Sequence, residues 1–268
     1  MIRRENLIFL LISIILLNLG LYASENKSVS PEQLILKSLE LQKNVREELN
    51  TIRCKRVEIM EDLDENWNVK EVRTTTYLTI VKYLEKGRLL KETIESIIEG
   101  GKPLSKDKIQ KQQEKLNKVS IEQNKKTLGL IKEKEKRESF SVSLTSDKLK
   151  KYKLTIIGED IKEGHKCWKI KMEPLEENMD IIDGICWIEI DSNQMISMEG
   201  KPAKNPPKIK SMSFRILNEK SLKDLYLTKE IEFTFFVEFL LFKKRYRVEM
   251  RYENYEILND LGTDFFIK

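Results

Sequence analysis

Histidine and cysteine often carry catalysis or hold a metal, and this sequence uses both sparingly. The single histidine, His165, follows Lys162-Glu163-Gly164, a turn signal that predicts a solvated side chain between two strands. Three cysteines scattered along the chain do not provide the spacing of a metal site. The sequence also lacks a nucleophile-elbow motif, a phosphate-binding glycine loop and a dinucleotide fingerprint. We therefore predict no metal, no cofactor and no enzymatic activity.

Three cysteines are too few for a disulfide scaffold, and they leave one pairing open. Cys167 and Cys186 each precede a tryptophan in neighbouring predicted strands. If the apolar faces of both strands point inward, the two sulfurs point in opposite directions and cannot pair. If both tryptophans point inward, the sulfurs share a face and can form a bridge. The alternative to a bridge is free, structural thiols.

Aromatic and apolar residues in the second half of the chain are the more prominent feature. In 231–239 they alternate with Glu232, Thr234 and Glu238, and 245–253 repeats the pattern, so the two segments predict a hairpin with one apolar face. The turn is expected at 240–244. This face either packs as an ordinary core on a helix or lines a cavity for an apolar ligand. The candidate lining residues are Trp168, Trp187, Phe214, Phe233, Phe235, Phe239, Tyr246 and Met250.

The N-terminus has the pattern of a secretory signal peptide. Arg3 and Arg4 precede an apolar run at 7–17, and small residues follow, so cleavage is expected after Ala23. The alternative is an uncleaved membrane anchor, because the 17 residues from 7 to 23 reach the lower limit of about 17–25 for a spanning helix. Both interpretations place the remainder on the far side of the membrane, in the periplasm or outside the cell.

The charge balance gives no indication of a nucleic-acid partner, and export would make nucleic acid a poor one. Without residues 1–23 the chain keeps 47 basic and 43 acidic residues, a net charge of +4. Although 35% of the whole chain is charged, its β-branched and aromatic residues cluster in runs. The composition therefore indicates a folded domain with a charged surface.

The elements expected around the aromatic face are one helix and a series of strands. Ser30 as N-cap and Pro31 at the first position begin a helix over 31–50. Short connections between the strands favour antiparallel order. The expected strands are 51–61, 69–84, 88–98, 152–161, 166–173, 185–190, 195–199, 208–217, 226–242 and 245–257.

A charged segment interrupts the strands. Lys106–Arg137 holds 11 basic and 5 acidic residues with few apolar ones, which predicts a long or broken helix with one wide solvated face. Its positive charge would suit contact with anionic lipid headgroups. The simpler alternative is a charged excursion without a partner.

The order of these features resembles the periplasmic lipoprotein-carrier (LolA/LolB-like) superfamily, as an uncharacterised longer relative. The resemblance lies in Gly164–Ile170, in the strand Gly184-Ile-Cys-Trp187-Ile-Glu-Ile-Asp191, and in Arg88–Ser105 with its Gly-Gly-Lys-Pro-Leu-Ser ending. It implies an unclosed β-barrel around a helical plug, with an apolar cavity for acyl chains. The chain departs from the carriers in its length and in the 106–137 segment.

Together these features predict an α+β fold: a long antiparallel meander forms a strongly bent, unclosed β-barrel around the N-terminal helix, with an extra long charged helix. The expected organisation is a signal peptide (1–23) and one LolA/LolB-like half-barrel domain (24–268) with a charged helical insertion at 105–138. The expected function is a periplasmic carrier or sensor that binds lipid or lipoprotein acyl chains. The alternative is an envelope interaction or scaffold protein that has a protein partner and no ligand.

Overall fold

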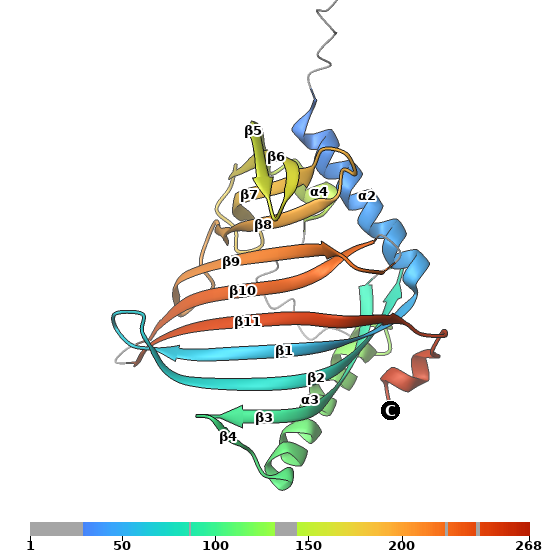
Figure 1. Cartoon of the computed structure of the whole chain (residues 1–268), viewed down its shortest axis with the longest axis vertical. Helices are drawn as coiled ribbons and strands as arrows, with labels where there is room; N and C mark the ends of the chain where they lie inside the picture. Colours follow the sequence, from blue (N-terminus) through green and yellow to red (C-terminus); the bar gives the residue numbers. More distant parts are fainter. Residues whose placement is uncertain (1–28, 86, 132–143, 223–224, 240–241) are drawn as a thin grey trace, which may run out of the picture.

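A computed structural model describes residues 29–85, 87–131, 144–222, 225–239 and 242–268. The predicted signal peptide and part of the charged segment lie outside these residues. Eleven antiparallel strands form one sheet that is not closed, in the order β4-β3-β2-β1-β11-β10-β9-β8-β7-β6-β5 (Figure 1). The helical elements are α2 (Pro31–Leu49), α3 (Lys106–Thr127), α4 (Ser146–Leu149) and the 3₁₀ turn η2 (Thr263–Phe266).

The strands follow the predicted meander closely. They are β1 (Thr51–Leu63), β2 (Val69–Leu84), β3 (Gly87–Glu99), β4 (Lys102–Pro103), β5 (Tyr152–Lys162), β6 (His165–Pro174), β7 (Ile182–Glu189), β8 (Met195–Pro202), β9 (Ile209–Lys220), β10 (Tyr226–Phe239) and β11 (Phe242–Ile257). All ten expected strands are present, and β4 is an addition of two residues. The turn expected at 240–244 is wrong in length, because Val237 pairs with Lys244 and the pairing continues to Phe239 and Phe242.

Helix α2 begins and ends at the residues that its capping signals require. The Ser30 carbonyl accepts a hydrogen bond from the Leu34 N–H, and Pro31 opens the helix. After Leu49 the chain enters the left-handed region at Asn50, which has a φ of 46°. The Asn50 carbonyl then accepts a hydrogen bond from the Tyr83 N–H, which fixes the end of α2 against β2.

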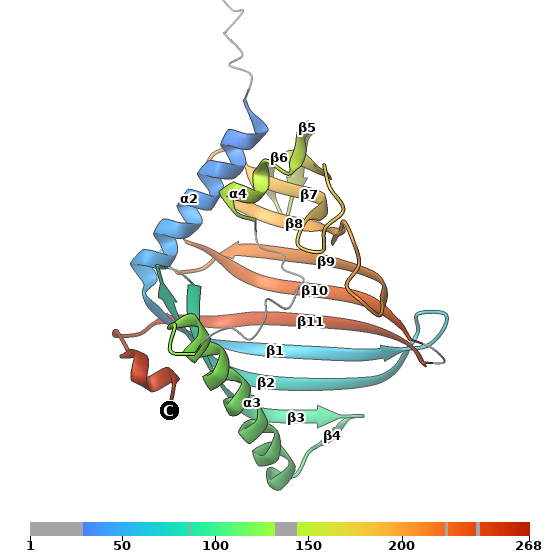
Figure 2. The same cartoon turned by 180° about the vertical axis from the view of Figure 1, so that it is seen from behind.

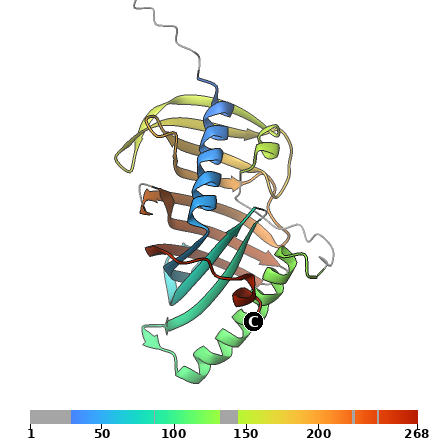
Figure 3. The same ribbon diagram turned by 90° about the vertical axis from the view of Figure 1, so that its right-hand side faces the viewer.

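Helix α2 crosses the sheet from strands β5–β9 to strands β1 and β2 (Figure 3). Near its start, Leu34 and Ile35 are buried against apolar residues of strands β5–β9. Near its end, Val45 and Leu49 are buried against β1 and β2. Burying each of these side chains contributes about 1.5–3 kcal/mol. We call the face of the sheet that these residues contact the α2 face.

A second, smaller apolar cluster occupies the opposite face. Successive side chains on β6, β7 and β9 point to opposite faces of the sheet. Ile170, Ile188 and Ile216 therefore pack towards α2, whereas Cys167 points to the opposite face and belongs to this second cluster. The other residues of this outer cluster are Trp187, Ile196 and Leu217. The sheet is therefore buried on both faces in the region of β6–β9.

Strands β7 and β8 approach each other closely at two glycines. Gly184 lies opposite Gly200 in the ladder, and a Cβ atom on Gly184 would lie 2.2 Å from the carbonyl oxygen of Glu199. A larger residue would have to push the two backbones apart. The glycine of the Gly184–Asp191 motif is therefore required by packing.

Helix α3 accounts for the first part of the predicted charged helix. It runs along the β3 and β4 end of the sheet (Figures 1 and 2). It ends at Thr127, ten residues before Arg137, and Gly129 follows with a φ of 70°. Residues 132–143 lie outside the described part of the chain.

Candidate binding face

The aromatic hairpin of β10 and β11 contributes its apolar side to the α2 face. Phe233 packs against the cluster that holds Leu34 and Ile35, which fixes its direction. Phe235 follows two residues later in the same uninterrupted stretch, and its partner across the ladder is Tyr246. Residues directly opposite each other on two strands share a face. The ring centroids of Phe235 and Tyr246 are 5.9 Å apart.

Six of the eight predicted lining residues lie on this face. Phe214 is buried and contacts Phe233 at 6.4 Å between ring centroids, and Trp168 packs on the same cluster. Met250 lies opposite Ile231, two residues before Phe233 in the alternation, and so points to the same side. The six are Trp168, Phe214, Phe233, Phe235, Tyr246 and Met250.

The structure does not bring Trp187 to this group. Trp187 belongs to the outer cluster, where its Nε1 donates to Asp160 Oδ2 at 3.2 Å and Lys162 Nζ lies 4.3 Å from its ring. Phe239 ends β10, and its side chain lies outside the described part of the structure.

Most of the aromatic row is partly exposed. Phe233, Phe235, Tyr246 and Met250 all keep intermediate exposure, whereas Ile35 and Leu49 of α2 are almost completely buried. Helix α2 therefore buries apolar residues of β5–β9 and of β1 and β2, while the row on β10 and β11 stays more open. A partly exposed apolar row on a sheet face is a surface on which an apolar ligand could lie.

A buried ionic cluster adjoins the aromatic row on the same face. Arg56 and Glu58 of β1 lie opposite Tyr252 and Met250 of β11. The Arg56 guanidinium donates to Glu92 Oε1 at 2.9 Å and to Glu58 Oε2 at 2.7 Å. The side chains of Arg56 and Glu92 are only 10% and 8% exposed. The α2 face is thus apolar on β10 and β11 and ionic on β1–β3.

Neighbouring groups complete this ionic cluster. Thr79 donates its hydroxyl to Glu92 Oε1 at 3.2 Å, and the Arg56 guanidinium lies 4.0 Å above the Tyr77 ring. Burial lowers the pKa of Arg56, but the Glu92 and Glu58 carboxylates outweigh it, so the pKa is raised overall. Arg56 therefore stays charged.

The sequence interpretation missed the ionic cluster. The signal available was the mixed alternation of β1, in which Cys54, Arg56, Glu58 and Met60 share one side. Glu92 stands two strands away from Arg56, and their meeting depends on the β1–β2 and β2–β3 registers together.

The predicted turn at 162–165 is present, since Lys162 pairs with His165, but the prediction of a merely solvated His165 side chain was wrong. His165 begins β6, and its Nδ1 lies 2.5 Å from Glu189 Oε1. Glu189 Oε2 accepts hydrogen bonds from the hydroxyls of Ser192 and Tyr226. Burial raises the pKa of Glu189, yet these hydrogen bonds and the histidine together lower it overall.

This arrangement differs from a catalytic triad. In a triad the histidine accepts the proton of the nucleophilic hydroxyl, while the carboxylate orients the histidine. Here Ser192 donates to the carboxylate itself, and His165 contacts the same carboxylate. In the described contacts the serine is therefore not activated as a nucleophile. The carboxylate joins the start of β6, the end of β7 and the start of β10.

The three cysteine sulfurs are free and buried. Cys186 packs towards α2 and Cys167 belongs to the outer cluster, so the first of the two predicted arrangements is present. Among the described residues, no three histidine, cysteine or acidic side chains gather as metal ligands would. The described helices also include none with the length and apolar character that crossing a membrane requires.

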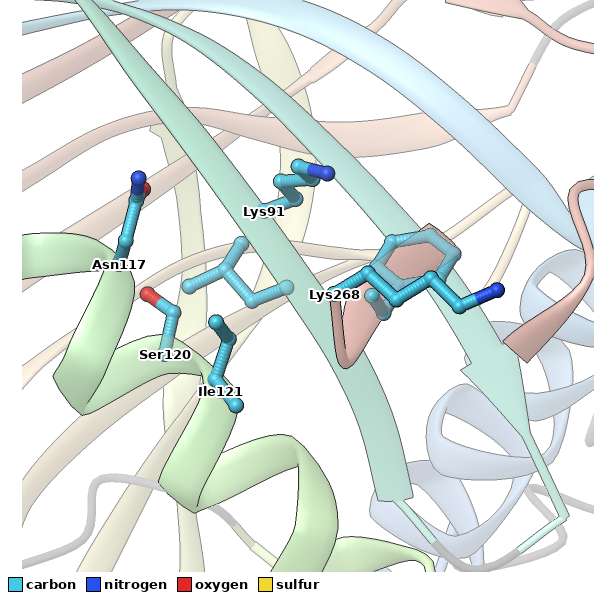
Figure 4. A pocket seen from close by; sticks show the side chains of 7 residues that line it. Lys91, Asn117, Ser120, Ile121 and Lys268 are labelled. Carbon is cyan, nitrogen blue, oxygen red and sulfur yellow. The ribbon is translucent and has the colours of Figure 1, made fainter. Parts of the chain in front are cut away.

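Two pockets lie away from the aromatic row. One, of about 70 Å³, lies between α3, β3 and the C-terminal turn (Figure 4). Asn117, Ser120 and Ile121 line it from α3, and Lys91 lines it from β3. The other is an open depression of about 230 Å³ at β1, β2 and β11, lined mainly by charged residues.

The comparisons with known proteins give structural likeness alone. No protein-family model matches the chain, and no curated protein matches it. Similar solved structures include an outer membrane lipoprotein-sorting protein domain from Vibrio parahaemolyticus, with 10% identity, a TM-score of 0.45 and coverage of 86% of this chain and 96% of the other. A DUF1329 family protein from Desulfovibrio piger has 10% identity and a TM-score of 0.46, with coverage of 88% of this chain and 95% of the other.

A third similar structure is a LolA superfamily protein from Nitrosomonas europaea, with 8% identity, a TM-score of 0.37 and coverage of 86% of this chain and 97% of the other. At identities of 8–10% and TM-scores below 0.5, such likeness says nothing of a ligand or a partner. Two of these structures are described as an outer membrane lipoprotein-sorting protein domain and a LolA superfamily protein, the kind of protein that the sequence resembles.

Proposed function

We propose that this protein is an exported carrier or sensor that holds a lipid, or the acyl chains of a lipoprotein, on the α2 face. The observation that carries the proposal is the partly exposed row of Phe233, Phe235, Tyr246 and Met250 on the α2 face. Burying acyl chains on this row would gain about 25 cal/mol for each Å² removed from water.

The neighbouring ionic cluster favours an amphipathic ligand over a purely apolar one. Arg56, Glu58 and Glu92 lie on the same face as the row, one to three strands away. An acyl chain on β10–β11 would place a polar group near β1 and β2. The ligand in this proposal therefore has an apolar chain and a polar head.

Mass spectrometry of the purified protein, together with binding of an apolar naphthylamine probe, tests the proposal. Co-purified lipid and saturable probe binding are expected. Phe235→Asp should weaken probe binding at least tenfold, because it places a charge in the row. Ile161→Asp is the matched control, since Ile161 is 75% exposed on β5 and should leave binding unchanged. Absence of both lipid and probe binding would refute the proposal.

Export is part of this proposal and rests on the pattern of residues 1–23. N-terminal sequencing of the protein recovered from cells tests it. A chain that begins at Ser24 is expected. A chain that keeps Met1 and separates with the membrane fraction would favour the anchor, and one that keeps Met1 in the cytoplasm would contradict export.

Helix α3 supports a further part of the proposal, contact with an anionic membrane surface. Five lysines on α3 are exposed and have no ion-pair partner among the described residues: Lys106, Lys108, Lys111, Lys115 and Lys118. Flotation with vesicles that contain phosphatidylglycerol tests the contact, with phosphatidylcholine vesicles as control. Replacing Lys108, Lys111, Lys115 and Lys118 by Gln should abolish the binding; binding that persists in this variant would contradict a role for α3.

A protein partner without a ligand is the second candidate, and the β5 end of the sheet favours it. Ile157 and Ile161 on β5 are 47% and 75% exposed, and Leu175 just after β6 is 66% exposed. Exposed apolar residues at a sheet edge suit protein contact. Ile161→Asp distinguishes the two: it should abolish partner capture under this candidate and leave lipid binding intact under the first.

A further inference from the structure

Strand β3 has one hydrogen-bonding edge that is paired only with the two-residue strand β4. Its other side pairs with β2 along nearly its whole length. On the free side the two residues of β4 pair only with Ile98 and Glu99. In the described chain, residues 87–97 have no strand partner there. The unpaired backbone groups of such an edge normally attract another strand.

Two side-chain amides of helix α3 form hydrogen bonds with backbone groups at this edge. The Leu90 N–H donates to Asn124 Oδ1 at 3.0 Å, and Asn124 Nδ2 donates to the Leu90 carbonyl at 2.8 Å. The Ile94 N–H donates to Gln113 Oε1 at 2.6 Å, and Gln113 Nε2 donates to the Glu92 carbonyl at 2.9 Å. A carboxamide carries the same donor and acceptor as a peptide group. The two side chains therefore imitate a paired strand.

The spacing makes α3 a substitute strand running antiparallel to β3. Gln113 and Asn124 are eleven residues apart, about 16 Å along a helix. Leu90 and Ile94 are four residues apart, about 13 Å along a strand. The bonded residues Leu90, Glu92 and Ile94 are alternate positions, which are the ones that a paired antiparallel strand would bond.

Apolar packing between α3 and β3 is thin. Asn124, at 2% exposure, is the one fully buried residue among those described on α3. The gap of about 70 Å³ lies between the two amides, where Asn117, Ser120 and Ile121 face β3 (Figure 4). Polar contacts therefore carry much of the attachment. A competing backbone could supply the hydrogen bonds to β3, but not the one from Asn124 Nδ2 to the Phe266 carbonyl at 2.8 Å.

We infer that the β3 edge is a strand-addition site that α3 occludes, and that its partner is an extended peptide segment of another protein. The peptide would displace Gln113 and Asn124 and pair with Leu90, Glu92 and Ile94. Strand β4 already shows this edge accepting a strand at Ile98 and Glu99. Pairing with a second copy of this chain is disfavoured, because two α3 helices would have to leave their edges for one new interface.

Strand β2 indicates the side-chain pattern that fits. On the paired side of β3, Tyr77 lies opposite Ile94, Thr79 opposite Glu92 and Val81 opposite Leu90. Cross-strand neighbours share a face, so the same complement is required on the free side. The partner segment should carry apolar residues four positions apart, with a small polar residue between them.

A labelled synthetic peptide of residues 74–83, which has this pattern, is the probe. Full-length Gln113→Ala/Asn124→Ala protein should bind it at least tenfold more tightly than the wild type. The control is Gln110→Ala/Gln123→Ala, which removes two exposed amides from the same helix and should match the wild type. Hydrogen exchange at the Leu90 and Ile94 amides should be faster in the first variant and should slow when the peptide is added.

Three results would overturn the inference. One is equal peptide affinity in all proteins, and another is faster exchange at Leu90 and Ile94 without peptide binding, which would make α3 a mere cover. The third is concentration-dependent dimerisation of the variant in place of peptide binding, which would identify a second copy as the partner. If the double variant does not fold, Gln113→Ala alone should bind the peptide at least threefold more tightly, and failure of that variant would also overturn the inference.

Discussion

At the scale of single residues, Arg56 and Glu92 stand out among the described ion pairs, because both side chains of the pair are buried. Arg56→Met should lower the free energy of unfolding by about 3 kcal/mol, because it leaves the buried Glu92 and the partly buried Glu58 without a cation. Urea unfolding measures this. Arg53→Met, on the same strand but paired with Glu256 at the surface, should cost less than about 1 kcal/mol. An equal loss in both variants would contradict a special role for Arg56.

Glu189 should give the protein a pH-dependent stability. Its pKa is lowered in the folded state, so its contribution is complete above the ordinary glutamate pKa and is lost as the pH falls through the folded value. Glu189→Gln should therefore lower the melting temperature more at pH 7 than at pH 3. Glu40→Gln, at an exposed position on α2, is the control. A difference between Glu189→Gln and the wild type that is constant with pH would contradict the assignment.

The cysteine thiols should be almost inert in the folded protein. Burial raises the pKa of Cys54 and Cys167 from 9.0 to about 11 and that of Cys186 to about 12. A pKa of 11 in place of 9 lowers the thiolate fraction at pH 8 about a hundredfold. A thiol reagent should label all three in denaturant and none rapidly in buffer. Fast labelling of the folded protein would show that the burial is incomplete.

Residue directions were predictable from alternation, while residue contacts were not. The alternation of apolar residues in 167–172 and 185–190 predicted, as one of two possibilities, that the sulfurs of Cys167 and Cys186 point to opposite faces. This arrangement is the one found. The contact of the His165 side chain was missed because its partner Glu189 is 24 residues away and belongs to another strand. A turn signal describes the backbone and carries no information about such a partner.

At the scale of elements, α2 should contribute stability through its buried side alone. Ile35→Ala should cost about 2–4 kcal/mol, because Ile35 is fully buried in the cluster with β5–β9. Leu36→Ala, at a neighbouring position with 42% exposure, should cost less than about 0.5 kcal/mol. Thermal unfolding of the two variants measures the difference. Similar losses would contradict the contacts of α2.

Element types and limits followed from capping residues and alternation. Ser30 and Pro31 marked the start of α2, and the period-two pattern marked the strands. The β10–β11 turn was predicted too long, since charged residues such as Lys243 and Lys244 can lie in a paired strand as well as in a turn. The covering of β3 by α3 could not be predicted, because Gln113 and Asn124 look like ordinary residues of a polar helix.

At the scale of the whole molecule, the sequence predicted an open antiparallel sheet with a helix on it, and the structure has that form. The predicted apolar face is present on β10–β11, while the ionic cluster of β1–β3 on the same side was not predicted. Alternation within one strand shows which residues share a side. It does not show which strands are neighbours, and the pairing of β1 with β11 joins residues as far apart as Arg53 and Glu256.

The position of β11 between β1 and β10 also sets the order in which the sheet can form. During synthesis, β1–β4 and β5–β10 emerge as two groups of neighbouring strands that share no ladder. The strand that joins them, Phe242–Ile257, emerges after both. Without residues 242–257 the two groups would share no ladder, and β1 and β10 would each have an uncovered edge. Only a chain that contains this strand can assemble the single sheet.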